Sequence, residues 1–214
     1  MAVRIIHAEV MEGLRQLEDE SVDCCLTSPP YYSQRDFQHA DQIGLEDSPP
    51  QYVEKLVLAF RDMRRVLRST GVFWLNVADT YAGHKDGRMI ADRLGREGGR
   101  EMTIAPSRNR DLMKAAGLKN KDLIGIPWRL ALALQKDGWF LRSDIIWAKT
   151  NGHPEKCTDR PHKTHEYIFL FSKAERYYYD DTPEMSRRSV WNMATETFSE
   201  SHHAVMPTDL AELC

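Results

Sequence analysis

The chain has 214 residues, of which 42% are hydrophobic and 29% are charged, a composition that fits one folded domain and excludes fibrous and disordered proteins. No apolar stretch approaches the roughly 18 residues of a membrane helix, and the four cysteines, two of them adjacent, exclude a disulfide scaffold and indicate a reduced, cytoplasmic protein. The net charge of -3 argues against a protein that coats nucleic acid without sequence preference.

The first predicted strand is the apolar run 22–26, which a Pro-Pro pair follows almost at once. A helix is predicted next, because Ser48 suits the N-cap position, Pro49 suits the first turn, and apolar residues then recur at helical spacing. Gly71 is expected to end this helix.

Strands and helices alternate through the rest of the chain. Further strands are predicted at 71–77, 139–148, 167–171 and 177–179, with a helix at 127–136 that Gly138 closes. This alternation indicates an α/β fold with a largely parallel sheet and helices on its faces. Ligands of such sheets bind beyond the carboxyl ends of the strands, where the loop after Leu26 lies.

The segment 83–121 differs in composition from the remainder. It holds ten Lys and Arg against five Asp and Glu, a local charge of +5 that leaves -8 for the other residues (-3 - 5). Because it is rich in glycine and poor in large apolar residues, it is interpreted as a mobile basic insertion without a core of its own. A solvated loop without a partner is the alternative interpretation.

The run Thr27-Ser28-Pro29-Pro30-Tyr31-Tyr32 is the most informative stretch. It would place a hydroxyl, a carbonyl and a ring face on one stiff loop at a strand end. Those groups suit a planar heterocycle with an exocyclic amino group, since a base stacked on an aromatic side chain gains roughly 1–3 kcal/mol. The plainer alternative is a turn that only ends the strand.

With this loop the sequence resembles the amino-methylating DNA methyltransferases. The similarity covers SVDCCLTSPPYYSQRDF at 21–37, GVFWLNVADTY at 71–81, the stretch 126–180, VWNM at 190–193 and HHAVMPTDLAELC at 202–214. The order of these motifs is typical of the permuted branch, in which the cofactor motif comes last. The resemblance implies one catalytic domain over 1–214 with a Rossmann-like, S-adenosylmethionine-dependent methyltransferase sheet, and the basic segment as an insertion.

The family mechanism implies that the target base is flipped into a pocket formed by Ser28, Pro29, Pro30 and Tyr31. The Ser28 hydroxyl and the Pro29 carbonyl would accept hydrogen bonds from the amino group and thereby position it for methyl transfer. Serine before Pro-Pro is more typical of cytosine-N4 than of adenine-N6 enzymes. No covalent intermediate is needed, so the adjacent cysteines are expected to be core residues of the strand.

The resemblance implies S-adenosylmethionine as cofactor, with Glu9, Thr27, His203 and Pro207 as candidate contacts. The family's Phe-x-Gly-x-Gly cofactor loop is absent from the 214 residues. The sheet is therefore expected to be C-terminally incomplete, with an exposed edge at 22–26, and the chain alone is expected neither to bind the cofactor tightly nor to turn over. A downstream segment or a second polypeptide would supply the glycine motif.

Double-stranded DNA is the implied partner, in a restriction-modification setting. Its candidate contacts are Arg35 and, in the basic segment, Arg93, Arg96, Arg100, Arg108 and Arg110.

Other functions stay open from the sequence. One is a catalytically inactive DNA-binding fragment, and another is a methyltransferase that acts on protein or RNA. Histidine and cysteine at 153, 157, 162 and 165 match no standard zinc spacing, so no metal site is predicted.

Overall fold

A computed structural model of the chain describes residues 3–37, 39, 41–83, 110–152, 154–182, 187–196 and 205–214. The chain divides into two compact units, which are described one at a time. The first comprises Met1–Ser28, Ala59–Asn76 and Leu134–Cys214, and the second comprises Pro29–Leu58 and Val77–Ala133.

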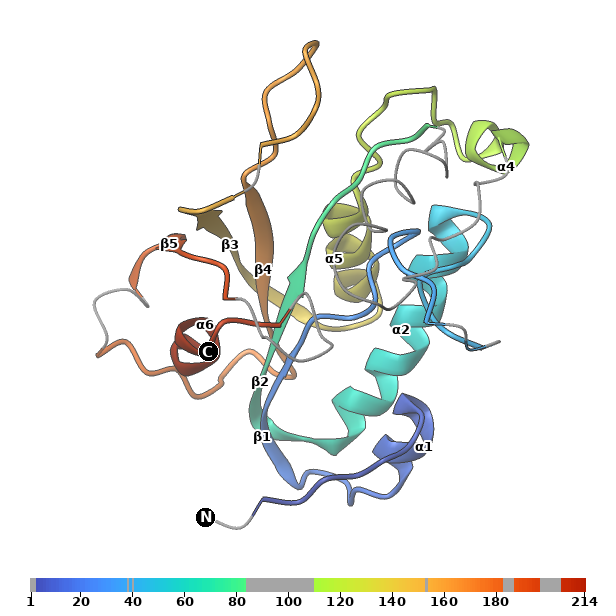
Figure 1. Cartoon of the computed structure of the whole chain (residues 1–214). Helices are drawn as coiled ribbons and strands as arrows, with labels where there is room; N and C mark the ends of the chain where they lie inside the picture. Colours follow the sequence, from blue (N-terminus) through green and yellow to red (C-terminus); the bar gives the residue numbers. More distant parts are fainter. Residues whose placement is uncertain are drawn as a thin grey trace. The chain divides into compact units, whose positions relative to one another are not determined.

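The first unit is organised around a five-stranded mixed sheet with the strand order β1-β2-β4-β3-β5 (Figure 1). The strands are β1 (Val22–Thr27), β2 (Leu67–Val77), β3 (Phe140–Lys149), β4 (His165–Ser172) and β5 (Val190–Met193). Strand β2 runs parallel to β1, and β5 runs parallel to β3, but β3 and β4 are antiparallel. The predicted α/β class is thus confirmed, while the expectation of a largely parallel sheet gives way to a mixed one.

Five helices are described: α1 (Val10–Arg15), α2 (Pro49–Val66), α4 (Arg110–Ala115), α5 (Ile126–Lys136) and α6 (Thr208–Leu213). The predicted helices at 49 and 127 are therefore confirmed, whereas α1 and the short strand β5 carried no prediction. No described helix is long and apolar enough to cross a membrane.

Alternate residues of β2 enter two different cores of the first unit, as the period of a strand requires. Trp74 packs with Trp191 of β5, at 6.0 Å between ring centroids, in a cluster that includes Leu210 of α6. Phe73 instead packs against Phe60 and Phe171, with 4.9 and 5.7 Å between the ring centroids. Buried on both faces, β2 reads in the sequence as a nearly continuous apolar run.

The boundary between α2 and β2 differs from the prediction. The helix ends at Val66 and the strand begins at Leu67, so Gly71 lies inside the strand and does not cap the helix. A Cβ atom at Gly71 would lie 3.1 Å from the carbonyl oxygen of Asp23 and 2.8 Å from Leu67 Cδ2. Glycine is favoured here because the Arg68 carbonyl oxygen, 3.0 Å from that position, and the backbone of β1 both leave too little room for a side chain, a constraint that helical periodicity does not reveal.

Two further expectations are corrected. The residues 177–179 form no strand, although the Tyr178 amide donates to the Thr70 carbonyl at 3.0 Å. The far end of the basic segment is folded, because Met113 and Leu118 are buried in the second unit. A backbone hydrogen bond without the repeating pattern of a paired strand does not define a strand. Two buried apolar residues hold the short helix α4 and the turn after it.

Asp79 fixes the start of α5 in the second unit. Its carboxylate accepts hydrogen bonds from the amides of Gly125 and Ile126 at 2.9–3.0 Å and from its neighbour Thr80 at 2.9 Å. These contacts satisfy amide groups that a helix leaves unpaired at its N-terminus.

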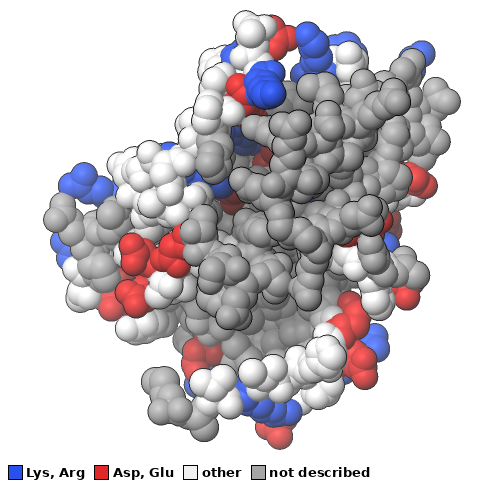
Figure 2. Space-filling view, in the orientation of Figure 1, with Lys and Arg blue, Asp and Glu red and all other residues white. Residues whose placement is uncertain are grey.

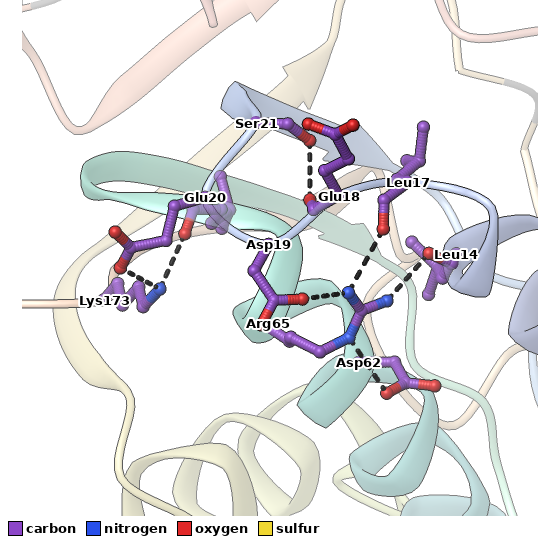
Figure 3. Close-up of polar contacts among 10 residues, drawn as sticks. Leu14, Leu17, Glu18, Asp19, Glu20, Ser21, Asp62, Arg65 and Lys173 are labelled. Atoms are coloured by element: carbon purple, nitrogen blue, oxygen red, sulfur yellow. Dashed lines mark hydrogen bonds and ion pairs between the residues drawn. The ribbon is translucent and has the colours of Figure 1, made fainter.

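Arg65 of α2 fixes the turn that leads into β1 (Figure 3). Its guanidinium donates to the carbonyl oxygens of Leu14 and Leu17, at 2.9 and 3.1 Å, and contacts the Asp19 carboxylate at 2.5 Å. The planar guanidinium group thus donates hydrogen bonds to one carbonyl in the last turn of α1 and to one just beyond it.

Arg65→Ala is expected to lower the free energy of unfolding by roughly 2 kcal/mol, because it removes the guanidinium that donates to the Leu17 carbonyl and to the Leu14 carbonyl, of which the latter keeps its hydrogen bond from the Leu17 amide. Arg68→Ala is the matched control: the Arg68 and Asp23 side chains are 52% and 73% exposed, so this variant should cost less than about 1 kcal/mol. Urea denaturation of both variants measures the difference, and equal losses would contradict the role given to Arg65.

Candidate functional site

Four polar side chains gather where strands of the first unit end. Ser28 directly follows β1, and Asn76 is the last but one residue of β2. Parallel pairing aligns Thr27 with Leu75, which brings Ser28 level with Asn76. Antiparallel pairing sets Glu166, near the start of β4, close to Lys149 at the end of β3. The register therefore assembles at one edge of the sheet residues that lie far apart in sequence.

These side chains form a continuous hydrogen-bonded chain. The Ser28 hydroxyl donates to Asn76 Oδ1 at 2.6 Å, and Asn76 Nδ2 donates to Glu166 Oε2 at 3.1 Å. Lys149 Nζ donates to Glu166 Oε1 and forms an ion pair with it. The chain takes one step per strand in the order β1-β2-β4-β3. Asn76 is 2% exposed and Glu166 is 9% exposed, so water competes little with these contacts.

The loop 28–31, predicted to be catalytic, continues in the second unit with a buried Pro29 and an exposed Pro30. The Pro30 carbonyl accepts a hydrogen bond from the Tyr52 hydroxyl at 2.9 Å. Tyr52 is completely buried, and burial together with the nearby Glu46 raises the pKa of its hydroxyl, which keeps the donor protonated. Gly44 packs against the loop, since a Cβ atom there would lie 3.2 Å from the Tyr31 carbonyl oxygen. The loop is therefore held by its own unit.

The Pro29 carbonyl receives no hydrogen bond from any residue that the structure describes, in contrast to the carbonyls of Pro30 and Tyr31. The Tyr31 carbonyl accepts from the Gln34 amide at 3.2 Å. The Tyr31 side chain is half-buried, whereas Tyr32 is buried and contacts Met113. Tyr31, which the sequence predicts as the stacking surface, is thus the more accessible of the two tyrosines.

The adjacent cysteines differ from the expectation that both lie in the core. Cys24 is exposed and Cys25 is half-buried, both on β1, the edge strand of the described sheet. Burial, with a smaller contribution from Cys24, raises the pKa of the Cys25 thiol to about 12. A thiol that stays protonated at neutral pH is a weak nucleophile, in agreement with a mechanism that uses no cysteine.

The predicted cofactor contacts are partly described. Glu9 is exposed and caps α1, with its carboxylate accepting from the Met11 amide at 2.8 Å. Thr27 is half-buried at the end of β1, and Pro207 is buried at the start of α6. His203 lies outside the described residues. Their roles remain predictions.

The predicted DNA contacts are described less completely. Arg35 is half-buried, and its carbonyl accepts from Gln42 Nε2 at 3.0 Å, which closes the loop around it. Arg110 begins α4, but its side chain is not among those described, and Arg93, Arg96, Arg100 and Arg108 lie outside the described residues. On the face shown in Figure 2, described acidic and basic side chains are interspersed. The prediction for the basic segment therefore rests on the sequence.

Of the histidine and cysteine residues weighed as zinc ligands, His153 is outside the described residues. The Cys157 thiol lies 3.7 Å from the Glu155 carboxylate and 3.6 Å from the Arg160 carbonyl. Arg160 and Glu155 form an ion pair, so this loop has polar contacts of its own.

Sequence reasoning assigned no role to Asn76, Glu166 or Lys149. Asn76 does carry a signal, because it is a polar residue inside the apolar strand sequence GVFWLNV. A buried amide needs partners. Its partners are Ser28, which lies 48 residues earlier in the chain, and Glu166 and Tyr167, which lie 90 and 91 residues later, and only the strand order identifies them.

The model of the N6/N4 DNA methylase family matches residues 22–214. The chain belongs to this DNA methylase family. Among its relatives is the Type II methyltransferase M.SmaI of Serratia marcescens, 46% identical over 99% of this chain and 73% of that protein. M.Cfr9I of Citrobacter freundii is 42% identical over 98% of this chain and 70% of that protein.

Solved structures show the same fold for this methylase. The cytosine-N4-specific PvuII DNA methyltransferase matches 91% of this chain with a TM-score of 0.59 at 18% identity, and the chain spans 57% of it, less than two thirds. A putative DNA modification methylase from Thermus thermophilus, complexed with S-adenosyl-L-methionine, matches 96% with a TM-score of 0.56 at 20% identity. The expected Rossmann-like methyltransferase sheet is thereby confirmed.

The described residues suit the methyl acceptor more completely than the methyl donor. Ser28 and Pro29 offer oxygen acceptors for an amino group, while Glu9 and Thr27 offer a carboxylate and a hydroxyl of the kind that bind a nucleoside. Gly125, directly before α5, does not bind the cofactor with its amide, because the Asp79 carboxylate already accepts hydrogen bonds from the amides of Gly125 and Ile126. Glu9, Thr27, His203 and Pro207 remain the residues predicted to hold the donor.

Proposed function

We propose that this methylase transfers a methyl group from S-adenosyl-L-methionine to the exocyclic N4 amino group of cytosine in double-stranded DNA. The observation that carries the proposal is the Ser28 hydroxyl, which donates its own proton to Asn76 Oδ1. Its oxygen lone pairs therefore stay available to accept a hydrogen bond from an amino group. The Type II methyltransferases among the relatives support DNA as the substrate and restriction-modification as the setting.

The chemistry required of this chain is positioning and polarisation. The lone pair of a base amino nitrogen is delocalised into the ring, so the nitrogen attacks poorly while it stays planar. Acceptance of its two hydrogens by Ser28 Oγ and the Pro29 carbonyl would favour a pyramidal nitrogen with an available lone pair. Tyr31 would stack on the base after it leaves the duplex. When bound, the cofactor supplies an electrophilic methyl group.

The choice of cytosine rests on serine at position 28. Adenine-N6 methylation is the alternative, and both bases present the same kind of amino group. Nucleoside analysis of DNA modified by the full-length enzyme decides between them. N4-methylcytosine is the expected product, and N6-methyladenine as the sole product would contradict the choice of base while leaving the reaction class intact.

Variants of the loop test the site assignment. Ser28→Ala is expected to lower kcat by roughly 10²- to 10³-fold, because it removes an acceptor aimed at the reacting amino group. Tyr31→Ala should weaken base binding by about 1–3 kcal/mol, whereas Tyr31→Phe keeps the stacking surface and should bind almost normally. Ser69→Ala, at an exposed serine near the other end of β2, is the control. Wild-type methylation rates in Ser28→Ala and Tyr31→Ala would contradict the assignment.

The basic segment is proposed as the main nonspecific DNA contact. Each phosphate that it neutralises should contribute a slope of about -0.9 to the logarithmic salt dependence of binding. Charge reversal at Arg93, Arg96 and Arg100 is therefore expected to flatten that slope. Fluorescence anisotropy over a range of salt concentrations measures it, and an unchanged slope would leave the segment as a solvated loop.

A further inference from the structure

The polar chain behind Ser28 contains an amide whose orientation is fixed by its surroundings. Asn76 Nδ2 donates to the Glu166 carboxylate at 3.1 Å and to the Tyr167 carbonyl at 3.3 Å. If the amide were turned over, its oxygen would face these two acceptors, neither of which can donate a proton. The arrangement with Nδ2 toward β4 is therefore strongly favoured, and Oδ1 must face Ser28.

We infer that Glu166 is a positioning residue for methyl transfer, which sets the orientation of Asn76 and thereby makes Ser28 a hydrogen-bond acceptor toward the base. This inference rests on the proposed function of Ser28. Asparagine cannot take up the hydroxyl proton, so Ser28 stays a neutral hydroxyl whose proton is committed to Asn76. The hydroxyl oxygen then presents only lone pairs to the amino group.

Lys149 completes the arrangement, because its ammonium group occupies one of the two carboxylate oxygens of Glu166. The other oxygen remains for Asn76. The Lys149 and Glu166 side chains are 22% and 11% exposed, so the ion pair is shielded from bulk water and holds the Glu166 carboxylate in one orientation. Two acceptor oxygens on residue 166 are thus needed at the same time.

Glu166→Gln keeps the shape of the side chain but leaves one acceptor oxygen. The ammonium of Lys149 attracts that oxygen more strongly than a neutral amide does, so the new amide nitrogen faces Asn76 Nδ2. Two donors then oppose each other, and Asn76 has to turn or move away from Ser28. We expect kcat to fall roughly 10- to 100-fold, as is found when a group that orients a reacting residue is removed, while the Kd for DNA stays within about twofold.

Glu20→Gln is the matched control, because Glu20 pairs with Lys173 just beyond the other end of β4 (Figure 3). Lys173 is 20% exposed, close to the 22% of Lys149, whereas the Glu20 side chain is 58% exposed against 11% for Glu166. The control therefore removes an ion pair from a lysine of similar burial in the same unit, at a more exposed carboxylate. Glu20→Gln should leave kcat unchanged. An equal fall of kcat in both variants would mean that Glu166 matters only for the stability of the sheet.

Combining Asn76→Asp with Glu166→Gln tests the direction of the hydrogen bonds. The amide at position 166 can then donate to a carboxylate at position 76, whose other oxygen accepts the Ser28 proton. The double variant should therefore exceed the kcat of each single variant, although the Tyr167 carbonyl loses its donor and recovery is partial. Asn76→Asp alone brings two carboxylates together and should be the least active.

A readout apart from activity is the side-chain amide NMR signal of Asn76. Its two protons should exchange slowly with solvent in the wild-type protein and faster in Glu166→Gln. Wild-type kcat in Glu166→Gln, or a folded double variant without recovery, would overturn the inference. If Glu166→Gln does not fold, the double variant decides alone. A wild-type enzyme that methylates no DNA would instead contradict the proposed function.

Discussion

The constraint on which the site depends is that a buried amide must satisfy all its hydrogen bonds at once. Asn76 lies between a hydroxyl on one side and a carboxylate and a carbonyl on the other. Only one orientation of its amide satisfies all three partners, so the sheet itself decides which way the Ser28 proton points. The direction of the Ser28 hydroxyl, at the start of the proposed catalytic loop, is thus set by residues that follow Ser28 in sequence by 48 residues or more.

The two ends of the same sheet use charge for different purposes. At the amino end of β2, Arg65 and Lys173 donate to backbone carbonyls and hold turns in place. At the carboxyl end of β2, the Glu166 carboxylate orients the neutral amide of Asn76, and this amide in turn orients the neutral hydroxyl of Ser28. The first arrangement stabilises the fold, whereas the second orients a group that the fold does not need. A polar residue inside a strand is thus better explained by its neighbours across the sheet than by its neighbours in sequence.

Local signals predicted the elements well where the chemistry is local. The Pro-Pro pair after an apolar run marked the end of β1, and Ser48 with Pro49 marked the start of α2. The prediction that Gly71 ends the helix was wrong, because Gly71 lies in β2, where the Arg68 carbonyl and the backbone of β1 leave little room for a side chain. The run 177–179 has the composition of a strand, yet no strand forms there, although the Tyr178 amide donates to the Thr70 carbonyl. The antiparallel pairing of β3 and β4 likewise depends on strand order, which no local pattern contains.

The loop Ser28–Tyr31 could be proposed as the site from sequence because its groups lie within a few neighbouring residues, whereas Asn76 and Glu166, which lie far along the chain, could not. A crystal structure of the full-length enzyme with DNA and a flipped target base tests this account most directly. We predict that Ser28 Oγ lies about 3 Å from the exocyclic amino nitrogen while it keeps its contact with Asn76 Oδ1. A base whose amino group is bound elsewhere, or a Ser28 hydroxyl turned away from Asn76, would contradict it.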